Sequence, residues 1–144
     1  MYRFQDKTLS IEERIDDLLG RMTLEEKVRQ MDIYAGTEFQ DQNGDFQMDK
    51  LLEVSGNEGL GCLQNRYSSA EANNEIQRRV MERSRLPIPV LFSEEALHGL
   101  IWPGCTVFPQ QLGLGATFEP TLAKAQGHGI AAVCQSIGIH ETWS

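Results

Sequence analysis

The first thirty residues carry the apolar pattern of two amphipathic helices. Residues 10–13, Ser-Ile-Glu-Glu, have the form of a capping box, in which the serine hydroxyl and the second glutamate each bond a free backbone N–H at a helix start. Apolar residues then recur at helical spacing: Ile11, Ile15, Leu18, Leu19 and Met22. Residues 23–26, Thr-Leu-Glu-Glu, repeat the signature. The pattern predicts a helix that ends near Arg21, a second helix directly behind it, and a hairpin formed by the two.

After this pair, short apolar runs alternate with helical patterns. The first predicted elements are a polar loop over residues 34–46, a short helix over 48–54 and a strand over 59–63. A helix capped within 68–71 and running to about Arg83 comes next, followed by a strand over 88–92. The last elements are a loop over 98–115 with a helical turn at 109–112, a helix over 120–137, and a strand from Ile139 onward. Pro87 and Gly138 are the stop signals of two of these helices. Short apolar strands alternating with helices are typical of a parallel sheet built from βα units.

This order of elements predicts an α/β fold. A complete (β/α)8 barrel takes about 250 residues and eight strands, whereas the 144 residues supply about three strands and end as another begins. We therefore interpret residues 1–144 as the N-terminal portion of a TIM barrel, incomplete in this chain, with no second domain.

Composition and charge exclude several classes of protein. With 40% hydrophobic and 24% charged residues, the chain resembles an ordinary globular domain. Thirteen Lys and Arg against 21 Asp and Glu give a net charge of -8, which argues against nucleic acid as a partner. Apolar runs fall short of the ~18 residues of a membrane helix, and no signal peptide is visible, so we expect a cytoplasmic protein without membrane contact. The odd number of cysteines, three, predicts neither a disulfide framework nor a zinc ribbon.

The segment directly after the strand over 88–92 is the main candidate for chemistry. Residues 93–99, Ser-Glu-Glu-Ala-Leu-His-Gly, follow the strand at the end where α/β sheets place ligand-binding side chains. Carboxylates suit sugars because they accept short, charge-assisted hydrogen bonds from hydroxyls. The alternative is structural, with Glu94 a solvated surface charge and His98 a satisfied loop histidine.

Other residue types give weaker signals. Trp102 and Trp143 are candidates to stack on a sugar ring, and packing in the core is an equal alternative. The three histidines lack metal-site spacing, so no metal is expected. Residues 127–132 match Gly-x-Gly-x-x-Ala but lie within a helical pattern, so we expect these glycines to allow close packing of the helix rather than to bind a dinucleotide.

Several segments together resemble one known family. They are residues 13–31 with the run Met-Thr-Leu-Glu-Glu-Lys-Val, residues 86–92 (Leu-Pro-Ile-Pro-Val-Leu-Phe), 94–99 (Glu-Glu-Ala-Leu-His-Gly), 106–110 (Thr-Val-Phe-Pro-Gln) and 138–140 (Gly-Ile-His). In this order they resemble the start of glycoside hydrolase family 3, and the resemblance covers essentially the whole chain.

The resemblance implies a retaining, exo-acting β-glycosidase that needs no cofactor or metal. Its substrate would be a small plant-derived oligosaccharide or glycoside, cleaved at the nonreducing end by a β-glucosidase or β-xylosidase. The family's Asp nucleophile lies on a later barrel strand, and its Glu acid/base usually comes from a following α/β sandwich domain. Both would lie beyond Ser144, so we expect no catalytic residue in this chain and no activity from the chain alone.

One sugar-binding position carries over from the family, and here it is Glu95. The glucosidase branch has Asp at this position, where it accepts hydrogen bonds from hydroxyls of the nonreducing sugar. Glutamate is one methylene longer than aspartate, and the sequence Glu-Glu-Ala-Leu-His-Gly resembles the β-xylosidase-like branch of the family. The pentose substrate of that branch lacks a hydroxymethyl arm. The alternative function, from another class of protein, is that of a catalytically silent sugar-binding or interaction module. The oligomeric state is left open.

Overall fold

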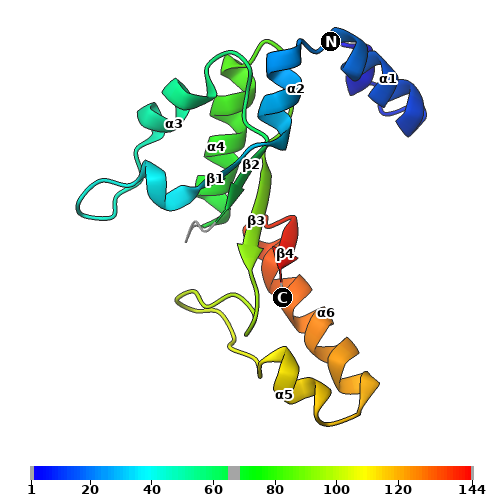
Figure 1. The fold of residues 1–144 in the computed structure, drawn as a ribbon, viewed down its shortest axis with the longest axis vertical. Coiled ribbons are helices and arrows are strands. Elements are labelled where there is room, and N and C mark those ends of the chain that lie inside the picture. The colour runs from blue at the N-terminus through cyan, green and yellow to red at the C-terminus, as the bar shows by residue number, and fades with distance from the viewer. Residues whose placement is uncertain (1, 65–68, 144) are drawn as a thin grey trace.

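The computed structural model describes residues 2–64 and 69–143 (Figure 1). The helices are η1 (Arg3–Gln5), α1 (Ile11–Arg21), α2 (Leu24–Met31), η2 (Gly36–Phe39), α3 (Met48–Ser55), α4 (Ala70–Arg83), α5 (Gln111–Gly115) and α6 (Pro120–Ile137), where η marks a 3₁₀ turn. The strands are β1 (Ile33–Ala35), β2 (Cys62–Gln64), β3 (Leu91–Glu95) and β4 (Glu141–Trp143). They form one parallel sheet in the order β1-β2-β3-β4. The α/β class is confirmed, and consecutive strands lie side by side as they do at the start of a barrel.

The two N-terminal helices begin where the capping boxes predict. Ser10 Oγ accepts from the Glu13 amide (3.3 Å), and Glu13 accepts in return from the Ser10 amide (3.1 Å). Thr23 and Glu26 make the same reciprocal pair at 3.2 and 2.8 Å. α1 ends at Arg21, as expected. These helix starts are predictable because their hydrogen bonds are local in sequence.

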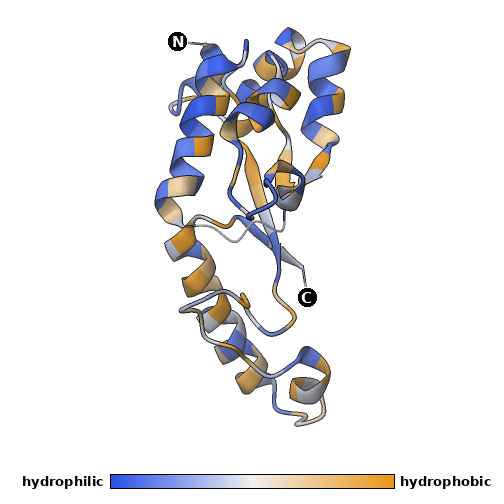
Figure 2. Ribbon diagram, turned by 90° about the vertical axis from the view of Figure 1, so that its left-hand side faces the viewer, coloured by the Kyte–Doolittle hydropathy of each residue, from blue (hydrophilic) through white to orange (hydrophobic). Residues whose placement is uncertain are grey.

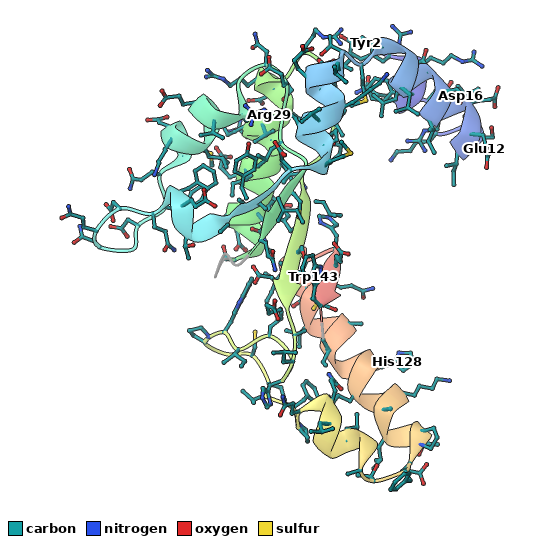
Figure 3. The ribbon with its side chains drawn as sticks, in the orientation of Figure 1. Tyr2, Glu12, Asp16, Arg29, His128 and Trp143 are labelled. Atoms are coloured by element: carbon teal, nitrogen blue, oxygen red, sulfur yellow. The ribbon has the colours of Figure 1, made fainter. Side chains whose placement is uncertain are left out.

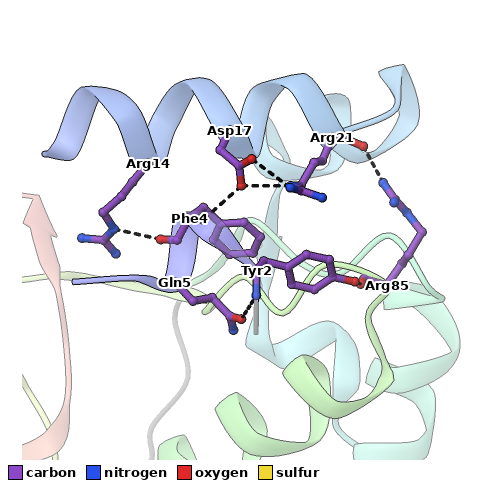
Figure 4. Close-up of polar contacts among 7 residues, drawn as sticks. All are labelled: Tyr2, Phe4, Gln5, Arg14, Asp17, Arg21 and Arg85. Atoms are coloured by element: carbon purple, nitrogen blue, oxygen red, sulfur yellow. Dashed lines mark hydrogen bonds and ion pairs between the residues drawn. The ribbon is translucent and has the colours of Figure 1, made fainter. Parts of the chain in front are cut away.

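The predicted hairpin of α1 and α2 is wrong, because α1 packs on η1 and extends away from the sheet (Figure 1). The Phe4 amide donates to Asp17 (3.0 Å), and Arg14 Nε donates to the Phe4 carbonyl (2.8 Å), as Figure 4 shows. Asp17 also accepts two hydrogen bonds from Arg21, both of 2.9 Å. These contacts fix α1 on the N-terminal segment. Part of its apolar stripe stays exposed: Ile11, Ile15 and Leu19.

An ion pair between a buried carboxylate and a half-exposed guanidinium ties α2 to the segment before β3. Arg85 donates to both carboxylate oxygens of Glu26 (2.8 and 2.5 Å), and the Glu26 residue is only 3% exposed. The same guanidinium donates to the Arg21 carbonyl (2.7 Å), and Tyr2 Oη donates to the Arg85 carbonyl (3.1 Å; Figure 4). Hydrogen bonds from Arg85 lower the pKa of the Glu26 carboxyl below its usual value.

The hydrophobic core lies on one face of the sheet, against the helices. Leu63 of β2 and Phe92 of β3 pack there with Ile76 and Val80 of α4. Figure 2 shows hydrophobic residues concentrated along the central strands, whereas the helices alternate hydrophilic and hydrophobic positions. The main hydrophobic cluster therefore lies on one side of the sheet.

Helix α4 also holds the sheet through two amide side chains. The Gln77 amide donates to the Val90 carbonyl (2.6 Å) and accepts from the Val90 N–H (2.7 Å), directly before β3. Asn73 donates to the Ile137 carbonyl at the end of α6 (3.0 Å). One helix thus fixes both the start of β3 and the end of α6.

Four predictions about strands need correction. β2 starts at Cys62 rather than residue 59 and continues to Gln64, because its partner β1 begins at Ile33, which pairs with Cys62. The polar stretch over 34–46 was expected to be a loop, yet it contains most of β1 and all of η2, because pairing with β2 satisfies the β1 backbone. β3 starts at Leu91 rather than at residue 88, because the backbone N–H and carbonyl of Val90 make hydrogen bonds to the side chain of Gln77. β4 starts at Glu141 rather than Ile139, since the Ile139 amide still bonds the Cys134 carbonyl of α6 (2.9 Å). The predicted turn at 109–112 is the helix α5, shifted slightly along the chain.

No helix among the described residues is long and apolar enough to cross a membrane.

Candidate functional site

The side chains of the sheet alternate between two faces, and the site lies on the face opposite the core. Because Leu63 and Phe92 face the helices, their strand neighbours face the other way. We call this second face the open face. The strand register orders it into rows across the sheet: Ile33, Cys62 and Leu91, then Ala35, Gln64, Ser93 and Glu141, then Glu95 and Trp143. In a (β/α)8 barrel the helices form the outer ring, so the open face lines the barrel interior.

Glu95 is the last residue of β3 and lies on the open face at its carboxyl end. Its side chain is exposed, and its strand partner is Trp143 of β4. Trp143 lies beside β3 in Figure 3 and is 42% exposed. Active sites of barrel enzymes lie at this end of the strands. Glu95 thus occupies a position from which a carboxylate and a neighbouring indole can reach a ligand in the barrel mouth.

Glu94 points the opposite way, and its interpretation as a solvated surface charge is wrong. The residue is only 5% exposed because it alternates with Glu95 and shares the helix-facing side with Phe92. The sequence contained the necessary signal, since the apolar Phe92 two residues earlier marks the buried face.

A small pocket of about 130 Å³ lies where β3 ends, and both glutamates line it together with His98 and Trp102. His98 Nδ1 lies 3.1 Å from the Phe108 carbonyl and, because a carbonyl only accepts, must donate to it. The Phe108 amide in turn donates to the His98 carbonyl (2.7 Å). The alternative interpretation, a loop histidine whose hydrogen bonding is satisfied within the protein, is thereby confirmed for Nδ1. The ring still borders the pocket.

The two tryptophans have different surroundings. Trp102 is 8% exposed and belongs to the hydrophobic core, which confirms packing for that residue. Trp143, on the open face, is the one of the pair whose ring area is available for a ligand.

The remaining polar and sulfur-bearing candidates are dispersed. His128 lies on the exposed side of α6 (Figure 3), and His140 stacks on Phe92 and accepts from its amide (3.0 Å). The described residues contain no group of three or more His, Cys, Asp or Glu that could hold a metal ion. The three cysteines are free thiols, and burial raises the pKa of both Cys62 and Cys134.

Sequence reasoning missed the row of polar residues next to Glu95 on the open face. Gln64, Ser93 and Glu141 are strand partners on β2, β3 and β4, and we call them the polar row. Their separation in sequence hides this proximity, which depends on the register of three strands. Only the alternation of Ser93 with Phe92 could have indicated that Ser93 and Glu95 share a face.

Comparison with known proteins assigns the chain to a family. The sequence model of the glycosyl hydrolase family 3 N-terminal domain matches residues 23–144. The chain belongs to glycosyl hydrolase family 3. This confirms the resemblance found in the sequence motifs.

Two curated relatives and two solved structures illustrate the similarity. The chain is 33% identical to a putative β-xylosidase of Formosa agariphila over 95% of the chain, and 28% identical to a periplasmic β-glucosidase of Salmonella typhimurium over 90%. A β-glucosidase structure from Erythrobacter marinus matches 98% of the chain with TM-score 0.76 and 27% identity. A β-glucosidase involved in saponin metabolism from intestinal bacteria matches 90% of the chain with TM-score 0.66 and 34% identity. These matches support the assignment to the barrel domain.

The chain spans less than a fifth of the length of these relatives. It covers 19% of the Formosa agariphila protein and 16% of the Salmonella typhimurium protein, and 19% and 16% of the two solved chains.

Proposed function

We propose that this chain forms the first strands of the barrel of a retaining β-glycosidase and that Glu95 binds the nonreducing sugar of its substrate. The observation that carries the proposal is the place of Glu95 in a chain of this family: an exposed carboxylate at the carboxyl end of β3, on the face that lines the barrel. The longer polypeptide proposed to contain the chain is called the parent enzyme below.

The proposed reaction is double displacement at the anomeric carbon by two carboxyl groups about 5 to 5.5 Å apart. The nucleophile and the acid/base come from parts of the parent enzyme outside residues 1–144. Within the chain, Glu95 contributes binding and orientation by accepting hydrogen bonds from sugar hydroxyls. The isolated chain is accordingly proposed to be inactive, and the substrate class to be plant-derived β-glucosides or β-xylosides.

The length of the Glu95 side chain favours a pentose. Compared with aspartate, glutamate carries its carboxylate one methylene farther into the subsite, toward the space that the hydroxymethyl arm of a hexose would fill. A hexose must then displace the carboxylate or lose a hydrogen bond to it. Discrimination of this kind is worth about 1 to 3 kcal/mol, or roughly 10- to 200-fold in kcat/KM. The relative named a putative β-xylosidase supports this preference.

The test compares matched nitrophenyl β-xyloside and β-glucoside in the parent enzyme. Glu95→Asp should shift the kcat/KM ratio toward the glucoside, and Glu95→Ala should lower kcat/KM for both, because a charge-assisted contact disappears. Glu12→Asp, an exposed glutamate on α1, is the matched control and should leave the ratio unchanged. An unchanged ratio in Glu95→Asp would refute the role in specificity. Sugar binding by the parent enzyme without turnover of any β-glycoside would favour the silent binding module instead.

A further inference from the structure

The ring of His98 has one nitrogen that is bonded within the protein and one that is not. Nδ1 donates to the Phe108 carbonyl (3.1 Å), so in the neutral ring Nε2 carries no proton and acts as an acceptor. None of the residues that the structure describes makes a hydrogen bond to Nε2. The buried side-chain atoms without a partner among these residues are Gln30 Nε2 and Ser93 Oγ, and His98 Nε2 is not one of them. His98 Nε2 is therefore an unused acceptor at an accessible surface.

The half-buried side chain of His98 borders the pocket of about 130 Å³ at the end of β3, which Glu95 also lines. The turn after the strand brings the two residues to one pocket, because the Gly99 amide donates to the Ala96 carbonyl (3.0 Å) and folds the chain back. Pockets for complete small ligands have about 300 to 1,000 Å³. The smaller volume here suits one edge of a sugar ring rather than a whole ligand.

Phe108 holds the His98 ring in place before any ligand arrives. Its amide donates to the His98 carbonyl (2.7 Å) and its carbonyl accepts from Nδ1, so two hydrogen bonds join the same two residues. The Phe108 ring is itself confined, because it lies 2.8 Å from where a Cβ on Gly99 would be and 2.9 Å from where a Cβ on Gly129 would be. A group that is fixed in advance costs less entropy when it binds a ligand.

Glu95 and His98 together offer acceptors to a ligand that carries donors. An ionised carboxylate only accepts hydrogen bonds, and so does Nε2 of a neutral histidine with its proton on Nδ1. Hydroxyls on adjacent carbons of a sugar project from the same edge of the ring, and each can donate one hydrogen bond. Such an edge can satisfy both groups at once. An anionic ligand is disfavoured, because it would bring negative charge to the carboxylate.

We propose that His98 Nε2 binds the nonreducing sugar, by accepting a hydrogen bond from the hydroxyl next to the one that Glu95 binds. The proposal rests on the proposed function, because it requires a sugar at Glu95. It assigns two roles to different atoms of one ring: Nδ1 fixes the loop to Phe108, and Nε2 binds the ligand. The two roles can therefore be separated by substitution.

Two amide substitutions of His98 in the parent enzyme test this separation. In His98→Asn the side-chain amide takes the position of Nδ1, so the bond to Phe108 stays and the acceptor for the sugar is lost. KM for nitrophenyl β-xyloside should rise about 3- to 10-fold, as for the loss of one neutral hydrogen bond, at an unchanged melting temperature. His98→Gln places its amide near the position of Nε2 instead. Its KM should stay closer to that of the wild type and its melting temperature should fall, because the Phe108 carbonyl loses its donor.

A histidine with only a structural role would give the opposite order of KM values in these two variants. His128→Asn is the matched control, since His128 lies on the exposed side of α6 (Figure 3). This variant should change neither KM nor the melting temperature.

Xylosides that each lack one ring hydroxyl identify the bonded hydroxyl. For the wild type, loss of the hydroxyl that donates to Nε2 should lower kcat/KM of the nitrophenyl substrate. In His98→Asn the same loss should have little further effect, because the hydrogen bond is already absent. The analogue that behaves in this way in Glu95→Ala should lack the adjacent hydroxyl.

The outcomes separate this proposal from the one on which it rests. If Glu95→Ala leaves kcat/KM unchanged, Glu95 is not a sugar ligand and both proposals fail. If Glu95→Ala is impaired but His98→Asn keeps the KM of the wild type, or loses as much as the wild type with every deoxy analogue, only the role of His98 is overturned. If neither variant of His98 folds, a crystal structure of the wild type with xylose decides. Nε2 should then lie within about 3.2 Å of a sugar hydroxyl, and a bound sugar without this contact overturns the proposal.

Discussion

Two glycines on α6 should respond oppositely to the same substitution. An ideal Cβ on Gly129 would lie 2.9 Å from Phe108 Cζ and 3.3 Å from Cε1, whereas a Cβ on Gly127 meets nothing within 4 Å. Phe108 cannot retreat easily. Its backbone is bonded twice to His98, and its ring lies 2.8 Å from where a Cβ on Gly99 would be. The expectation that these glycines allow close packing therefore holds for Gly129 alone.

The magnitudes follow from two terms. Alanine is favoured over glycine within a helix by about 0.8 to 1 kcal/mol, and this gain applies equally to Gly127→Ala and Gly129→Ala. The clash with Phe108 applies only to Gly129→Ala and costs about 1 to 3 kcal/mol, as overpacking usually does. Gly127→Ala should therefore be stabilising, and the difference between the two variants should equal the overpacking cost.

Urea unfolding of the parent enzyme and the two variants measures this difference directly. The account predicts that Gly129→Ala has the lower unfolding midpoint of the two variants at an unchanged m-value. Equal midpoints would show that Phe108 is not held against α6 as described, and the reasoning would be refuted.

Three further predictions concern the ion pair, the thiols and the sheet edge. Because Arg85 lowers the pKa of Glu26, the pair should stabilise the fold above pH about 4.5 and lose this contribution as the pH falls through the folded-state pKa. The free energy of unfolding of Glu26→Gln should therefore fall less on acidification than that of the unmodified protein. Parallel curves of unfolding free energy against pH for the two proteins would contradict this. Burial raises the pKa of Cys62 and Cys134, so a disulfide reagent at pH 8 should modify the half-buried Cys105 first, and faster labelling of either buried thiol would be inconsistent with the structure. The isolated chain should self-associate through the exposed strand β4 and the open face, and sedimentation as a monomer with a sharp melt would argue against that.

The helices could be predicted well because their signals are local. Ser10 and Thr23 cap α1 and α2 as the sequence indicates, and Gly138 ends α6 in the left-handed conformation. The contacts between helices could not be predicted from periodicity. The apolar stripe of α1 suggested a partner helix, but Asp17 and Arg14 fix α1 to η1 through hydrogen bonds to one backbone unit.

The strands were less predictable because their boundaries depend on distant partners. β1 has only three residues, and it exists because β2 pairs with it. An apolar run suggested a strand from residue 88, but the side chain of Gln77 on α4 makes hydrogen bonds to the backbone N–H and carbonyl of Val90. The strand pairing of β3 therefore begins at Leu91. Pairing with β4 extends β3 to Glu95, so Glu94 and Glu95 lie in the strand and their side chains point in opposite directions.

The candidate site was predictable only in part for the same reason. Motif similarity singled out Glu95 as the candidate, and its role in sugar binding stays a prediction. The polar row required the register of β2, β3 and β4, which joins Gln64, Ser93 and Glu141 across long stretches of sequence. The exclusion of Glu94 from the open face, in contrast, could be inferred from the sequence, because the apolar Phe92 two residues earlier marks the buried face.

A crystal structure of the parent enzyme with xylose bound tests the central claim most directly. The account predicts a Glu95 carboxylate oxygen within about 3.0 Å of a hydroxyl of the sugar in the nonreducing-end subsite. A sugar bound in that subsite with no contact to Glu95 would contradict the account.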